Sequence, residues 1–218
     1  MSLKEKIRIP KYSLGEELMN SITHGIGAIF SIVALILLLI KSVKTGSALA
    51  IVSSAVYGAS SIMLFTISCI YHALAKNNGK RVFRIIDHCT IYLLIAGTYT
   101  PYALIALPAP KGIIIFAINW LCAIIGIILN SIDLEKFKKI SMVLYLVMGW
   151  MVIFTFSDLL KNLPLTSIII MLTAGILYTV GAIFYGIGKN KKYMHSLFHI
   201  FVLIAAVLFF ISIYCYVI

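Results

Sequence analysis

Seven long runs of apolar residues occupy most of the chain, and short polar segments separate them. Each break contains Lys, Pro, Gly or Asn, which are typical of loops. A helix needs about 20 mainly apolar residues to cross the hydrocarbon core of a bilayer, and the runs have roughly that length. The pattern therefore predicts an all-α integral membrane protein, a bundle of seven transmembrane helices over residues 21–40, 48–72, 88–107, 112–131, 140–157, 165–187 and 196–217.

The composition supports this interpretation and argues against a soluble fold. Of the 218 residues, 62% are hydrophobic and only 11% are charged, and a soluble domain of this size cannot bury so much apolar surface. The N-terminal stretch lacks a small-residue cleavage site of the secretory kind, so we expect the first helix to be retained. Two parts are predicted: a short basic N-terminal segment, residues 1–20, and a single transmembrane domain, residues 21–218.

Lys and Arg residues are divided unequally between the two sides of the predicted bundle. With seven helices, 14 of the 18 basic residues fall on the side that holds the N-terminus. Short cytoplasmic loops are enriched in Lys and Arg, so the N-terminus is predicted to be cytoplasmic and the C-terminus outside. The net charge of +11 is thereby attributed to loops that flank helices, and no nucleic-acid partner is expected. The predicted location is the plasma membrane, as a multi-pass protein.

A few ionisable residues lie at the ends of these apolar runs. His72 closes the second run, Asp87 precedes the third, and His195 and His199 open the last. Ionisable side chains at membrane depth are rare and by default mark a function. The predicted topology brings all of them to the cytoplasmic end of the bundle. Further polar residues without an assigned role fall at the same level: Glu17, Asn20, His24 and His88.

The spacing of the histidines is compatible with a metal site. His195 and His199 are four residues apart, so they share one helix face with their Cβ atoms about 5–6 Å apart. With His72 as a third ligand, the fourth position stays open for water, as in catalytic zinc sites. Imidazole ligands favour zinc, although copper, nickel and iron also accept them. Asp87 is predicted to accept a hydrogen bond from the water or to act as the base, and Ser68, one turn before His72, to support Asp87 or the substrate carbonyl.

Simpler interpretations exist for the same residues. A histidine at the membrane edge often only extends its ring towards the interface. An Asp at the start of a helix, as predicted for Asp87, is often an N-cap. Because His72, Asp87 and the His195–His199 pair fall on three helices at one depth, the metal interpretation is favoured.

Five short motifs resemble one protein family. They are Glu17-x-x-Asn20-x-x-x-His24, Ser68-x-x-x-His72, Asp87 within Phe83-Arg84-Ile85-Ile86-Asp87-His88, Ala96-Gly97-Thr98-Tyr99-Thr100-Pro101, and His195-x-x-x-His199. In this order they resemble the hemolysin III branch of the progestin and adipoQ receptor family over nearly the whole chain. The resemblance implies seven helices, a cytoplasmic N-terminus, a zinc ion on the three histidines and a zinc-bound water held by Asp87.

The resemblance also suggests activities. The similar adiponectin receptors and alkaline ceramidases imply hydrolysis of a lipid amide such as ceramide, with a membrane lipid as the partner. The leading hypothesis is thus a zinc-dependent hydrolase of a lipid amide or ester that uses Asp87 and Ser68. The alternatives are a non-enzymatic sensor or receptor of membrane state with a structural zinc, and a pore-forming cytolysin. Protein partners cannot be inferred from the sequence.

Overall fold

The computed structural model describes residues 7–188 and 191–218, and within these ranges every regular element is helical. Lys4, Lys6 and Lys189, which entered the count of basic residues, lie outside them. Six of the described helical segments are long and apolar enough to cross a membrane, so the all-α membrane class is confirmed. The elements are α2 (Leu14–Thr45), α3 (Ala48–Ala73), α4 (Asn78–Pro101), η1 (Tyr102–Ala106), α5 (Ala109–Gly149), η2 (Met151–Thr155), α6 (Phe156–Asn162), α7 (Leu165–Ile187), α8 (Met194–Ser212) and η3 (Ile213–Val217).

Local signals fix both ends of α2. At its start, the Ser13 hydroxyl accepts a hydrogen bond from the Glu16 amide, and the Glu16 carboxylate accepts one from the Ser13 amide at 2.9 Å. This reciprocal capping box satisfies two amides that a helix leaves free. At its end, Gly46 adopts a left-handed conformation with φ of 67°, which glycine allows without steric cost. The chain then reverses into α3, whose N-cap is Ser47.

The start of α4 corrects the interpretation of Asp87 as an N-cap. The helix begins at Asn78, where the Asn77 side chain accepts a hydrogen bond from the Lys80 amide at 2.9 Å. Asp87 therefore lies well inside the helix. The apolar run is shorter than the helix because the first turns of α4 are polar. These turns remain helical because Asn77 caps them and because their basic side chains find partners elsewhere in the bundle.

The helix α5 contains the two predicted runs 112–131 and 140–157 up to Gly149, and the loop predicted between them is reduced to a break at one residue. Asp133 has non-helical φ and ψ of −159° and 95°, and its carboxylate accepts a hydrogen bond from the Lys136 amide at 2.9 Å. The two parts of α5 pack antiparallel, since Ser141 donates to Asn130 at 2.6 Å. With the two parts counted as one segment, the described residues contain six long helical segments instead of the predicted seven.

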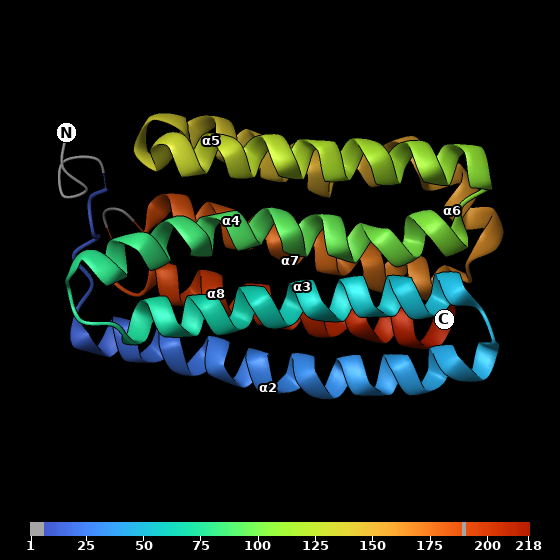
Figure 1. Cartoon of the computed structure of the whole chain (residues 1–218), viewed down its shortest axis with the longest axis horizontal. Coiled ribbons are helices and arrows are strands. Elements are labelled where there is room, and N and C mark those ends of the chain that lie inside the picture. Colours follow the sequence, from blue (N-terminus) through green and yellow to red (C-terminus); the bar gives the residue numbers. More distant parts are fainter. Residues whose placement is uncertain (1–6, 189–190) are drawn as a thin grey trace.

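The helices lie side by side along one long axis (Figure 1). At one end of the bundle α2, α4 and α8 begin and α3 ends; we call it the histidine end, because it holds His72 and His195. The opposite end, the far end, contains the α2–α3 turn, η1, α6 and η3. The largest cluster of buried apolar residues lies towards the far end and includes Tyr102, Ile115 and Ile213. The largest apolar core and the candidate chemistry thus occupy different ends.

Candidate metal centre

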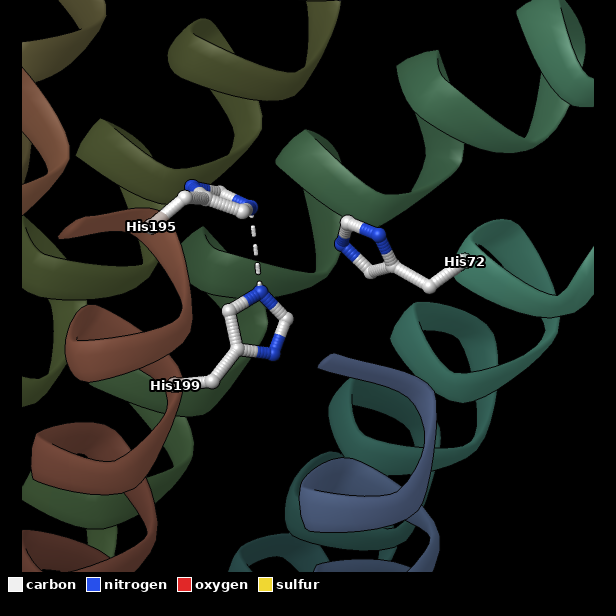
Figure 2. Close-up of side chains that lie close together, drawn as sticks. All are labelled: His72, His195 and His199. Carbon is white, nitrogen blue, oxygen red and sulfur yellow. Dashed lines mark hydrogen bonds between the residues drawn. The ribbon is translucent and has the colours of Figure 1, made fainter. Parts of the chain in front are cut away.

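Three histidines converge at the histidine end. His72 comes from the last turns of α3, and His195 and His199 come from the first turns of α8. All three are buried, and one ring nitrogen from each lies within 4.8 Å of the others. Figure 2 shows the two α8 rings on one side and the His72 ring facing them across a common space. The sequence expectation that helices α3 and α8 bring these residues together is met by the structure.

The atoms present fit a transition-metal ion. The Nε2 atoms of His195 and His199 are 3.1 Å apart, close to the roughly 3.3 Å that two nitrogens take up when each is about 2.0–2.1 Å from a tetrahedral zinc. The buried Nε2 atom of His72 has no hydrogen-bond partner among the described residues. Such an atom costs about 1–3 kcal/mol unless something satisfies it. Neutral imidazoles suit zinc, copper, iron or nickel better than calcium or magnesium.

Glu17 fixes the ring of His72. The Nδ1 atom of His72 lies 2.7 Å from the Glu17 carboxylate, and an ionised carboxylate only accepts hydrogen bonds. The proton must therefore be on Nδ1, which leaves the lone pair of Nε2 directed at the other histidines. Lys80 donates to the second oxygen of Glu17 at 2.8 Å. The sequence analysis left the role of Glu17 open, although its spacing from Asn20 and His24 already places the three near one face of a helix.

A short N-terminal strap, which we define as residues 7–13, covers the histidines. The ring of Tyr12 stacks on His195 with centroids 4.8 Å apart and an interplanar angle of 12°. Arg84 donates to the Arg8 carbonyl at 2.6 Å, and Arg81 donates to the Ile7 carbonyl at 3.3 Å. Burial raises the pKa of the Tyr12 hydroxyl, which keeps it neutral. Hydrophobicity could not have singled out this segment, because it precedes the first apolar run.

His195 and His199 line a cavity of about 160 Å³ that extends into the apolar part of the bundle. Asp87 and Ser68 both line this cavity beside His195 and His199. Asp87 is half-buried and is not part of the group of close nitrogen atoms. It therefore lies beside the candidate metal position instead of in it. Deeper walls of the cavity are apolar and include Leu64, Ile91, Leu94, Phe198 and Val202.

Two further histidines belong to the surroundings of this site. The ring of His24 lies 3.8 Å from that of His199, and neither of its nitrogens has a partner among the described residues. His88 also lines the cavity. Neither His24 nor His88 belongs to the group of nitrogens that could hold one ion. The sequence left both His24 and His88 without an assigned role.

Comparisons with known proteins agree with the motifs. A family model described as Haemolysin-III related matches residues 12–210. Hemolysin-3 of Bacillus cereus is 41% identical over 215 residues, which cover 99% of this chain and 98% of that protein. The Hemolysin-3 homolog of Bacillus subtilis (strain 168) is 39% identical over a region that covers 94% of this chain and 96% of that protein. The human Monocyte to macrophage differentiation factor is 25% identical over 74% of this chain and 68% of its own.

Proposed function

The chain belongs to the hemolysin III branch of the progestin and adipoQ receptor family, and we propose that it is a zinc-dependent membrane hydrolase that cleaves a lipid amide or ester. The observation that carries this proposal is a group of three buried imidazoles, two of which, those of His195 and His199, line an apolar cavity. A carboxylate and a hydroxyl line the same cavity beside them, those of Asp87 and Ser68. This is the set of groups that metal-assisted hydrolysis requires.

The proposed chemistry divides between the metal and the chain. His72, His195 and His199 would hold the zinc ion, which when bound would supply a Lewis acid and lower the pKa of a water to about 7. Asp87, on the cavity wall, accepts the proton of the attacking water and later returns it to the leaving amine or alcohol. Ser68 donates a hydrogen bond to the substrate carbonyl oxygen, where negative charge develops. Its position one turn before His72 on α3 places the two side chains on the same helix face.

The shape of the cavity favours a substrate with a long apolar chain. Its walls below the histidines are almost entirely apolar, so a hydrocarbon chain fits there and a polar metabolite does not. Gly149 of α5 and Gly175 of α7 both line it, and a Cβ added to either would meet no atom within 4 Å. The space beside these glycines supports lateral access of a lipid between α5 and α7. The amide or ester group then lies next to Asp87.

We also propose seven membrane crossings, with the N-terminus in the cytoplasm, the C-terminus outside and the plasma membrane as the location. The break at Asp133 supports this count, because each antiparallel part of α5 then crosses separately. The opposite ends at which α2 begins and η3 ends agree with an odd number of crossings. With 14 of 18 basic residues on the N-terminal side, the metal site would face the cytoplasm.

Metal content and turnover test this proposal in two steps. Protein purified without chelators should contain one zinc per chain, and both His72→Ala and His195→Ala should lose it. The wild type should then release fatty acid from a panel of lipid amides and esters that includes ceramide, and Asp87→Asn should keep its zinc but lose most of its turnover. A wild type free of metal would contradict the zinc site. Unchanged turnover in Asp87→Asn would contradict the role of Asp87.

A sensor of membrane state is the second candidate. It is favoured by the fact that the three histidines join α3 to α8, so that an ion would tie two distant parts of the chain. Stoichiometric zinc without any product from the lipid panel, together with a loss of stability on chelation, would support it. Release of dye from liposomes by the wild type and by His72→Ala alike would instead support the cytolytic activity that the names of the Bacillus relatives suggest.

A further inference from the structure

Glu17 and Lys80 form a buried chain of contacts that ends on a candidate metal ligand. The Glu17 carboxylate accepts from His72 Nδ1 at 2.7 Å and from Lys80 Nζ at 2.8 Å, with one oxygen for each partner. Lys80 is only 1% exposed. Burying an ammonium group is costly unless it is paired and its hydrogen bonds are satisfied. Packing alone does not explain why the charge of Lys80 is buried here.

The other contacts of Lys80 show how its charge is used. Its Nζ atom also donates to the carbonyls of Leu74 at 3.0 Å and His72 at 3.4 Å. These carbonyls end α3, where a helix leaves acceptors free and where a positive charge is favourable. Lys80 therefore holds both the backbone that carries His72 and the carboxylate that orients its ring. The Lys80 ammonium group thus holds His72 both at its backbone carbonyl and, through Glu17, at its ring.

The contact with Glu17 also decides which nitrogen of His72 faces the site. The Asn20 amide group lies 3.3 Å from the same Nδ1 atom, and an amide N–H could in principle donate to it. The carboxylate is closer and can only accept a hydrogen bond, so the proton stays on Nδ1. Nε2 then carries a lone pair that is free to bind a metal ion. That Nε2 atom is the one without a partner among the described residues.

We propose that Glu17 and Lys80 are positioning residues for the metal: Lys80 holds Glu17, and Glu17 holds His72 in the tautomer and orientation in which Nε2 binds the ion. The inference rests on the metal site of the proposed function but not on hydrolysis. Partners of this kind typically change metal affinity by about 10–100-fold when removed. Lys80 does not contact the imidazole and acts through the carboxylate of Glu17 and the backbone carbonyl of His72.

Zinc affinity, measured by competition with a chromophoric chelator on the full chain in detergent, tests this arrangement. Glu17→Gln should weaken zinc binding by about 10–100-fold and change the visible spectrum of the Co²⁺-loaded protein, because a ligand is no longer held. Lys80→Met should weaken binding in the same direction by a smaller factor. In the Glu17→Gln background, Lys80→Met should have a smaller effect than in the wild type, because only the contacts of Lys80 with the backbone carbonyls remain to be lost. Lys80→Arg should restore part of the affinity.

The chain offers a matched control in the pair of Arg84 and Glu135, a second ion pair at the histidine end, with a distance of 2.5 Å. Among the described residues no hydrogen bond or ion pair joins this pair to His72, and its one link to the site is the bond from Arg84 to the Arg8 carbonyl of the strap. Glu135→Gln should lower the thermal midpoint of the metal-free protein and leave zinc affinity within about twofold. If Glu17→Gln does not fold, Glu17→Asp, which keeps the charge and shortens the reach, takes its place and should also weaken binding.

Wild-type zinc affinity and an unchanged Co²⁺ spectrum in Glu17→Gln would overturn the proposal. Equal effects of Glu17→Gln and Glu135→Gln on zinc affinity would also overturn it, because the effect would then be one of general stability. A wild type that binds zinc but hydrolyses no lipid would contradict the proposed function and leave these positioning roles intact. The two proposals can therefore fail separately.

Discussion

The histidine end and the far end of the bundle bury polar groups in different ways. At the far end, hydroxyl groups satisfy one another: Tyr102 donates to Ser212 at 2.7 Å, and Ser212 lies 2.9 Å from the hydroxyl of Ser167. At the histidine end, polar atoms without a partner among the described residues are gathered in one place, on Asn20, His24, His72 and His199. The far end pairs most of its buried hydroxyl groups, with Ser53 as an exception among the described residues, whereas the unused donors and acceptors of the histidine end are concentrated around the histidines.

This difference predicts that the far end contributes mainly to the stability of the bundle and the histidine end mainly to ligand binding. A hydrogen bond between helices in a membrane contributes on average about 0.6 kcal/mol, so the far end gains a little from each of its contacts. Each unsatisfied buried atom costs about 1–3 kcal/mol until a ligand satisfies it. The histidine end should therefore depend on its ligand for stability, and the far end should not. The predictions below test that separation, beginning with the largest expected effect.

Removal of a metal ligand should abolish binding without unfolding the bundle. His199→Ala should reduce zinc affinity by at least about 1000-fold, because two imidazoles remain where a site needs three protein ligands. The rise in thermal midpoint that added zinc gives the wild type should disappear with it. The metal content of the purified variant and its melting curve with and without zinc provide the measurement. Stoichiometric zinc in His199→Ala would show that this histidine is not a ligand.

A side chain added at the far end should destabilise the bundle without changing metal binding. A Cβ at Gly112 would lie 2.0 Å from the backbone oxygen of Ala103, and backbone cannot move aside easily. Gly112→Ala should therefore destabilise the bundle by about 1–3 kcal/mol and leave zinc affinity unchanged. Gly186→Ala, where a Cβ would meet no atom within 4 Å, is the matched control. A large loss of zinc affinity in folded Gly112→Ala would show that the two ends are coupled.

Opening the strap should alter the rate of metal exchange more than the affinity. Tyr12 covers His195 by stacking, and the surroundings of a site control the access of solvent to it. Tyr12→Ala should speed removal of zinc by a chelator about tenfold, a change of about 1.4 kcal/mol in the barrier. Tyr12→Phe keeps the ring and should behave as the wild type. Equal rates in all three proteins would mean that the strap does not limit access.

The smallest effect should come from a single hydroxyl at the far end. Tyr102→Phe removes the hydrogen bond to Ser212 and should lower the free energy of unfolding by about 0.6 kcal/mol. Zinc affinity should not change. Unfolding in mixed detergent measures the difference, and Tyr102→Phe combined with Ser212→Ala should cost little more than either alone. A loss well above about 1.7 kcal/mol would exceed the values known for such bonds.

The sequence predicted the apolar helices well because hydrophobicity defines them, but it located their polar ends poorly. Hydropathy cannot show that α4 begins at Asn78, since the capping by Asn77 has no hydrophobic signal. The same limit hid how short the connection at Asp133 is, where one non-helical residue separates the two antiparallel parts of α5. Charged residues there stay helical because they lie beyond the apolar layer, where water or ion pairs satisfy them.

The candidate ligands were predictable because they occur as a spaced pair and a helix-end histidine at one predicted depth. The residues that hold them were not. Glu17 contacts His72 across 55 positions of sequence, and no spacing rule connects residues on different helices. Tyr12 lies before the first apolar run and stacks on a residue of α8. Such partners depend on how helices rotate against each other, which composition and periodicity do not specify.

The order of the ligands along the chain has a consequence for biosynthesis. His72 is made early, in α3, whereas His195 and His199 are made late, in α8. A nascent chain that has inserted α2 to α7 holds a single one of these imidazoles and cannot retain the ion. If the site binds a metal as proposed, metal uptake would follow insertion of α8, and an apo chain and a metallated chain would differ in maturation as well as in chemistry. Zinc occupancy would report that membrane insertion has reached its last helix.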